Sequence, residues 1–212
     1  MLKIALAEEG IDPAECEINI DHNLGINIVN GVKLPIIYPK SWVHNAQTLW
    51  TDDKDYTFYF KGYPGKHQER KQLLEAFDEK NDSYIEFSNN GRNIETKDEF
   101  DWDYWAALAK SCYGLCPHQP DWPGSIHAMW TYRYIECLFA RVIPVNFRAT
   151  ALSEKFTSPS INIWDDQIDD LHIIEQCKEQ ILDLNFKVAC EKFLLSQTQC
   201  KYIISQSEEM AS

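Results

Sequence analysis

The stretch from Trp130 to Phe147, with the sequence WTYRYIECLFARVIPVNF, constrains the fold more than any other part of this chain. Four of its residues recur at spacings of three and four, which predicts one shared helix face: Tyr134, Cys137, Leu138 and Arg141. Residues 142–147 then form a short apolar run rich in β-branched side chains, as is typical of a buried parallel strand. A helix followed directly by such a strand is half of an α/β crossover.

Strand and helix patterns alternate from residue 56 onward. Strands are predicted at 56–60, 83–87, 111–117, 142–147 and 161–164, and helices at 67–77, 100–110 and 150–157. Alternation of this kind predicts an α/β domain with a parallel sheet and helices on both faces. Ligands bind such sheets beyond the carboxyl ends of the strands. The loops expected at that edge are 61–66, 88–92, 118–130 and 148–150.

The two ends of the chain carry different patterns. Residues 2–7 are predicted as a strand, and residues 16–38 alternate loosely around a hairpin turn at Asn30-Gly31. Residues 38–55 are predicted as a loop with one helical turn near 44–50, and 165–170 as an acidic loop. From 171 to about 205 we expect one or two long helices.

Composition excludes several classes of function. The net charge of −13 argues against nucleic acid or an anionic membrane as the main partner, because both require a basic surface. No apolar run approaches the roughly 18 residues of a membrane span, and the apolar start of the chain is too short for a signal peptide. Seven cysteines without a CxxC pair make a zinc site improbable and favour reduced thiols. We therefore expect a soluble, cytoplasmic protein.

Arg133 and Glu136 lie three residues apart and are predicted neighbours near the start of a helix. An arginine can hold a phosphate through two parallel hydrogen bonds, and a carboxylate can accept both hydroxyls of a ribose. Further polar residues and glycines lie in or just after the ligand-side loops: Lys61, Gly62, Arg70, His118, Gln119 and Ser125. Each of them alone is ordinary at a protein surface, but together and in this order they favour a nucleotide site.

The motifs between residues 56 and 166 resemble the nucleotide-sugar-binding half of exostosin-like glycosyltransferases, in a small viral or bacterial form. That half typically has an apolar strand ending in Leu-Cys-Pro, a loop with Gly-Ser, an Arg and a Glu three residues later, and then Ile-Pro-Val. This chain has these elements in order: Leu115-Cys116-Pro117, Gly124-Ser125, Arg133, Glu136 and Ile143-Pro144-Val145. It departs from the pattern at His118, where the family often has Arg or Lys, and at 140–142, where Ala-Arg-Val replaces a segment that usually contains a glycine.

The resemblance implies a fold of GT-B type, built from Rossmann-like parallel sheets. In this chain it implies a reduced N-terminal, acceptor-side region at 1–55 and a donor-binding domain at 56–170. Helices at 171–212 would pack back toward the N-terminal part and complete a shortened first half. The location would be the cytoplasm, of a host cell if the protein is viral.

The implied activity is transfer of a pentose or hexose from a nucleoside-diphosphate sugar to a carbohydrate hydroxyl. The resemblance suggests a UDP-linked donor, inversion at the anomeric carbon, and no metal or other cofactor. Donor-binding residues would be Lys61, Gly62, Arg70, His118, Ser125, Tyr132, Arg133 and Glu136. An inverting enzyme also needs a general base near the acceptor. The candidates are Glu8, Glu9, Asp12, Asp21 and His22, of which Asp21 and Glu9 are favoured.

Two other interpretations stay open. One is a non-catalytic module that binds a nucleotide or a carbohydrate without turnover. The other is an unrelated α/β enzyme, such as a phosphate-ester hydrolase, although the chain lacks both GxSxG and GxxxxGK[ST]. The Asp-Trp-Asp at 101–103 is interpreted as a helix start with a capping carboxylate rather than as a metal motif.

Overall fold

The structure, a computed structural model, describes residues 4–7, 18–21, 26–29, 32–35, 38–64, 68–88, 100–117, 132–148 and 160–193. In the four short segments before residue 38, and at residues 192 and 193, it describes the backbone alone. All structural statements below concern these residues.

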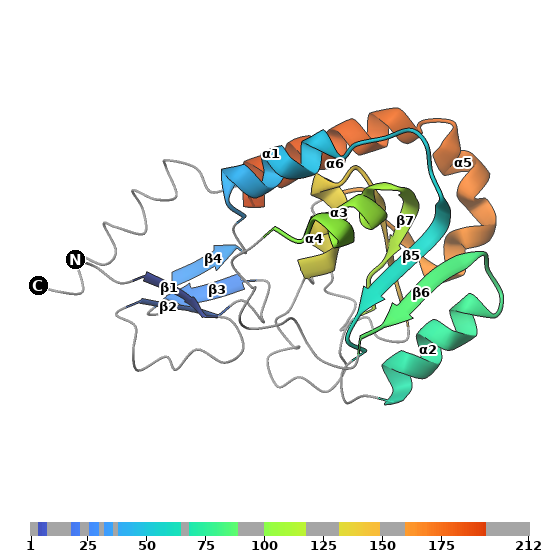
Figure 1. Cartoon of the computed structure of the whole chain (residues 1–212), viewed down its shortest axis with the longest axis horizontal. Helices are drawn as coiled ribbons and strands as arrows, with labels where there is room; N and C mark the ends of the chain where they lie inside the picture. Colours follow the sequence, from blue (N-terminus) through green and yellow to red (C-terminus); the bar gives the residue numbers. More distant parts are fainter. Residues whose placement is uncertain are drawn as a thin grey trace, which may run out of the picture.

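A five-stranded parallel sheet forms the centre of the fold (Figure 1). Its strands, in spatial order, are β6 (Ser83–Phe87), β5 (Tyr56–Gly62), β7 (Ser111–Leu115), β8 (Ile143–Asn146) and β9 (Ile163–Trp164). The sequence of β5, YTFYFKG, explains its place near the middle, because aromatic and β-branched side chains suit a pleated surface buried on both sides. The predicted α/β class with a parallel sheet is confirmed, and the sheet is compatible with a Rossmann-like fold.

The strand order reverses direction at the boundary between β5 and β7. From β5 the chain passes through α2 (Gln68–Asp78) to β6 on one side. It then returns through α3 (Trp102–Ala109) to β7 on the other side, and through α4 (Tyr132–Phe139) to β8. The crevice at the carboxyl ends of two strands where the order reverses is the usual ligand site of an open α/β sheet.

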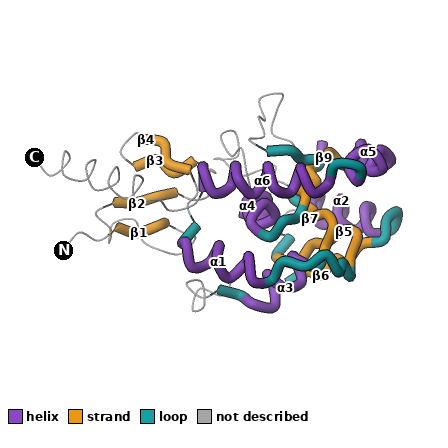
Figure 2. Tube along the Cα trace, turned by 90° about the horizontal axis from the view of Figure 1, so that it is seen from above, coloured by secondary structure: helices purple, strands orange, loops and turns teal. Residues whose placement is uncertain are grey.

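Helices cover both faces of this sheet, as predicted. One core cluster joins Tyr59 to Trp105 of α3 and Leu138 of α4, whereas a second joins Phe58 and Tyr113 to Phe77 of α2. Helix α6 (Lys178–Phe193) contributes to both clusters and packs along α4, and α5 (Leu171–Glu175) contributes to the second (Figure 2). The rigid sheet thus holds the first turns of α2, α3 and α4 at its carboxyl edge.

Four short strands lie to one side of the sheet, at the end of the molecule away from α2 and α5 (Figures 1 and 2). Strands β1 (Ile4–Ala7) and β2 (Ile18–Asp21) pair in parallel. Strands β3 (Ile26–Val29) and β4 (Val32–Pro35) pair antiparallel, with Val29 opposite Val32, which confirms the hairpin predicted around Asn30-Gly31.

Three local predictions are wrong. Residues 40–48 form a full helix, α1 (Lys40–Thr48), instead of a loop with a single turn, and Val43 and Ala46 anchor it in the core. The acidic segment Asp165–Asp170 is a 3-10 helix, η5, whose start is held by a hydrogen bond from the Trp164 N–H to the Gln167 side chain. Arg141 lies outside α4, in a left-handed turn, and does not share the face of Tyr134.

The turn at Arg141 ends α4 and starts β8. The Val142 N–H donates to the Cys137 carbonyl and the Arg141 N–H to the Leu138 carbonyl, the paired hydrogen bonds of a Schellman motif. The residue at this position needs a positive φ, which is 55° for Arg141 and normally favours glycine. The arginine is held there by ion pairs to Glu179 and Asp183 of α6 and by the Trp50 ring.

No helix among the described residues has the length and apolar character needed to cross a membrane. The domain boundaries at 55 and 170 stay predictions.

Candidate functional site

Two arginines meet at the carboxyl edge of the sheet, at the point where the strand order reverses. Arg70 is in the first turn of α2 and Arg133 is the second residue of α4, so they arrive from helices on opposite faces. Both lie over the ring of Phe60, near the end of β5, with guanidinium carbons 5.6 Å and 4.3 Å from the ring centroid. The aromatic face holds the two cations in place without neutralising them.

Three buried nitrogen atoms of the two guanidinium groups have no hydrogen-bond partner within the described part of the chain. Arg70 is 9% exposed and its Nε has no hydrogen-bond partner. Arg133 is partly exposed as a residue, but its Nε and Nη1 are buried and equally without a partner. None of the ion pairs found among the described residues involves either arginine. A buried N–H group without a hydrogen bond is costly, so the arrangement fits a site at which the working protein binds an anion.

Electrostatics support the same interpretation. Burial, together with repulsion from Arg133, lowers the pKa of Arg70 to about 10. Burial also works against the charge of Arg133, but the neighbouring Tyr104 and Glu136 raise its pKa. Two neighbouring cations that repel one another where solvation is poor favour the binding of a multiply charged anion such as a diphosphate.

Gly62, the last residue of β5, makes room for Arg133. A Cβ atom at position 62 would lie 2.5 Å from the Arg133 Nη2, closer than real Cβ contacts, and the φ of 156° also disfavours a side chain. A glycine here therefore allows the guanidinium to rest directly against the strand end. The predicted donor-binding residues Gly62, Arg70 and Arg133 are thus brought together.

Glu136 is buried one turn below Arg133. Its Oε1 accepts a hydrogen bond from the Tyr38 hydroxyl (3.2 Å) and its Oε2 accepts one from Tyr104 (2.7 Å). Burial raises the pKa of Tyr104, so this tyrosine stays a protonated donor at neutral pH. The ribose role of Glu136 stays a prediction.

The other predicted residues are placed differently or not described. The Lys61 Nζ pairs with Glu86 of β6 at 3.2 Å, and Tyr132 starts α4 with its side chain partly buried. Asp21 ends β2, which pairs with β1 and is not a strand of the five-stranded sheet. Glu9, His118 and Ser125 lie outside the described residues, as do the further base candidates Glu8, Asp12 and His22.

Three residues that line or support this edge were not predicted from the sequence: Phe60, Tyr104 and Asn146. Asn146 is the last residue of β8, and it is fully buried with neither Oδ1 nor Nδ2 hydrogen-bonded within the described chain. The signal for it was present, because a polar residue ends an apolar strand at the ligand-side edge. For Phe60 and Tyr104 the sequence contains no signal that separates them from core aromatics.

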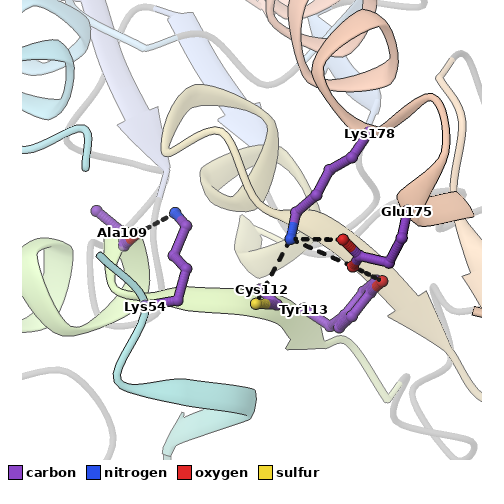
Figure 3. A network of polar contacts seen from close by, with 6 residues as sticks. All are labelled: Lys54, Ala109, Cys112, Tyr113, Glu175 and Lys178. Carbon is purple, nitrogen blue, oxygen red and sulfur yellow. Dashed lines mark hydrogen bonds and ion pairs between the residues drawn. The ribbon is translucent and has the colours of Figure 1, made fainter. Parts of the chain in front are cut away.

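A second group of cations, in contrast, has hydrogen-bond partners in the protein. At the start of β7, Lys178 lies between the Glu175 carboxylate (3.2 Å) and the Cys112 sulfur (3.6 Å), and Glu175 also accepts the Tyr113 hydroxyl (Figure 3). Burial lowers the pKa of Lys54, whose ammonium donates to the Ala109 carbonyl at 2.6 Å. These contacts join β7 to α5 and α6, and we interpret this group as structural.

The thiols of Cys116 and Cys137, near the arginines, lack the features of a reactive nucleophile. Cys116 and Cys137 are buried with their sulfur atoms 3.9 Å apart, and burial raises the pKa of Cys137. Among the described residues, no three His, Cys, Asp or Glu side chains gather in a way that would hold a metal ion. The absence of a metal stays a prediction.

Comparison of the sequence with protein-family models gives no match, and a search among curated proteins finds no significant relative.

Proposed function

We propose that this chain is a glycosyltransferase of GT-B type that binds a nucleoside-diphosphate sugar, UDP-linked in the first instance, at the Arg70–Arg133 pair. The observation that carries the proposal is the meeting of two partly desolvated guanidiniums with unpaired N–H groups at the switch point of a parallel sheet. Structural arginines at such depth are normally paired with carboxylates. The unpaired N–H groups of Arg70 and Arg133 are instead available for the diphosphate of a donor.

In the proposed reaction the bond between the anomeric carbon and the β-phosphate oxygen breaks as the acceptor oxygen attacks that carbon. Negative charge grows on the departing diphosphate, and Arg70 and Arg133 stabilise it. Their positions are fixed by Phe60 and Gly62 before the reaction, so little reorganisation is needed. The proton of the acceptor hydroxyl passes to a carboxylate, for which Asp21 and Glu9 are the candidates.

The first experiment measures ligand binding by calorimetry and thermal shift, with pyrophosphate, UDP, GDP and UDP-glucose as probes. A ligand at 100 times its dissociation constant should stabilise the parent protein by about 2.7 kcal/mol. Arg133→Ala and Arg70→Ala should each weaken diphosphate binding by about 2–5 kcal/mol, because each removes a charge-assisted contact at a poorly solvated site.

Lys71→Ala is the matched control. Lys71 follows Arg70 in α2, but its ammonium pairs with Glu75 at the surface, so the variant removes one positive charge without altering the arginine pair. It should bind the probes as the parent does. An equal loss of affinity in all three variants, or no binding of any probe by the parent, would overturn the assignment of the donor site.

Turnover separates the two interpretations that share this site. Release of UDP from UDP-glucose, stimulated by an oligosaccharide acceptor and abolished in Arg133→Ala, supports the transferase. Binding that depends on Arg133 without release of UDP from any UDP-sugar supports the non-catalytic nucleotide-binding module instead.

A further inference from the structure

Asn146 is a buried polar residue to which neither the sequence nor the proposed chemistry had assigned a role. Its side chain is 0% exposed, yet Nδ2 and Oδ1 both lack a hydrogen-bond partner among the described residues. Buried amides in proteins are nearly always hydrogen-bonded, because leaving one unpaired is costly. An exception at the carboxyl edge of a parallel sheet suggests that the partner is a ligand.

The register of the sheet places Asn146 at the same edge as the arginine pair, two strands from β5. Leu115 of β7 is opposite Val145 of β8, and the Cys116 N–H donates to the Val145 carbonyl at 2.8 Å. Cys116 and Asn146 are therefore neighbours across two adjacent strands, about 5 Å apart, and β5 with Gly62 lies one further strand away. Asn146 is thus roughly 10 Å from the strand end that holds Arg133.

Asn146 also faces the correct side of the sheet. Side chains alternate along a strand, and Ile143, Val145 and Phe147 belong to the core cluster beneath α2. Asn146 therefore faces the α4 side, which is also the side of Cys116, whose sulfur lies against Cys137 of α4. The amide therefore faces the side of the sheet on which α4, the helix that carries Arg133, is packed.

The chemistry of the amide restricts its ligand. An asparagine side chain presents a donor and an acceptor next to one another. A phosphate oxygen would satisfy only Nδ2, and a cation only Oδ1. Two neighbouring hydroxyls of a sugar ring satisfy both, because each hydroxyl donates and accepts. A nucleobase edge would also match, but the base is separated from the diphosphate by the ribose, whereas a sugar ring is attached to it directly.

We propose that the Asn146 amide binds a pair of hydroxyls on a sugar ring attached to the diphosphate, and so takes part in selecting the donor. This inference rests on the proposed donor site at Arg70 and Arg133. The sugar is either the transferred sugar or the ribose of the nucleotide. The two alternatives predict weaker binding of different probes when the amide is removed.

The test measures the affinity of the full chain for pyrophosphate, ribose 5-phosphate, UDP and UDP-glucose, with GDP and GDP-mannose substituted if the parent prefers guanine. The variants are Asn146→Leu, which removes both hydrogen-bonding groups, and Asn146→Ser, which is smaller and keeps a hydroxyl in case the leucine does not fit. Loss of the amide should weaken the affected probes roughly tenfold, whereas pyrophosphate should bind unchanged.

Each pattern of loss has one meaning. Weaker binding of UDP-glucose alone assigns the amide to the transferred sugar. Weaker binding of UDP-glucose, UDP and ribose 5-phosphate assigns it to the ribose. If the variants lose affinity for UDP but not for ribose 5-phosphate, the amide recognises the base and the inference is overturned. Unchanged affinity of both folded variants for every probe would overturn it as well. If the parent binds no diphosphate at all, the donor site itself fails.

Discussion

Replacement of Asn146 by leucine should stabilise the unliganded protein, although most substitutions in a core destabilise it. The two side chains branch at the same atom, and position 146 is fully buried on a strand of the central sheet. Burial of an amide without a hydrogen bond costs about 1–3 kcal/mol by mutational measures. Asn146→Leu removes that cost, so the free energy of unfolding should rise by about 1–3 kcal/mol.

Asn185 provides the matched control. It is 1% exposed, but its Oδ1 accepts the Ile161 N–H at 2.8 Å and its Nδ2 donates to the Ile161 carbonyl at 2.7 Å. Asn185→Leu removes both hydrogen bonds to the Ile161 backbone, and should lower the free energy of unfolding by about 1–3 kcal/mol, the net contribution of two such bonds. The same chemical change is therefore expected to have opposite signs at the two sites.

Urea denaturation followed by tryptophan fluorescence gives both free energies, and a thermal melt gives an independent check. In a chain of 212 residues, each kcal/mol should shift the melting temperature by about 2–4 °C. If Asn146→Leu destabilises the protein as much as Asn185→Leu does, the amide has a structural partner. The stability argument and the ligand role of Asn146 would then both be wrong.

Three further predictions test the surroundings of the site. Gly62→Ala should weaken pyrophosphate binding about tenfold in calorimetry while the protein stays folded, because its Cβ displaces the Arg133 guanidinium. Arg141→Ala should be less stable than Arg141→Gly by about 1 kcal/mol in urea, because both lose the same ion pairs and only glycine accepts the φ of 55° without strain. Because Tyr104 is buried, the free energy of unfolding should fall above about pH 10, with a slope of up to ~1.4 kcal/mol per pH unit from this one residue. Burial raises the pKa of Tyr104 in the folded state only, so the stabilisation is complete below pH 10 and is lost above it; Tyr104→Phe should reduce this slope in pH-dependent denaturation.

The central sheet could be predicted from the sequence because its signals are local. The aromatic run at Tyr56–Gly62 and the helical spacing in Gln68–Asp78 each specify one element, and strict alternation of such elements leaves few topologies other than a parallel sheet. Helix α1 was not predicted because only Val43 and Ala46 bury its inner face. Its first residue follows a proline, and no side chain caps its start. Packing against α3 and α4, which the local sequence does not encode, stabilises it.

The candidate site was predictable to the extent that it depends on charge. Arg70 and Arg133 were identified as phosphate ligands from residue type and position, and they do meet over Phe60. The sequence could not show that Lys61 pairs with Glu86, because that contact depends on the register between β5 and β6.

Asn146 shows why the remaining part of the site needs a structure. In the sequence it is one polar residue at the end of an apolar strand, a position that suggests a role but does not show whether its side chain has a partner. Asn185 is equally buried, and its amide is hydrogen-bonded to Ile161. The difference between a structural and a ligand-binding amide is the presence of a partner, which is a property of three-dimensional packing. Natural proteins accept unpaired polar groups mainly where function requires them. The unpaired amide of Asn146 and the unpaired guanidinium nitrogens of Arg70 and Arg133 occur at the same edge of the same sheet, and this coincidence is the strongest reason to assign them to one ligand.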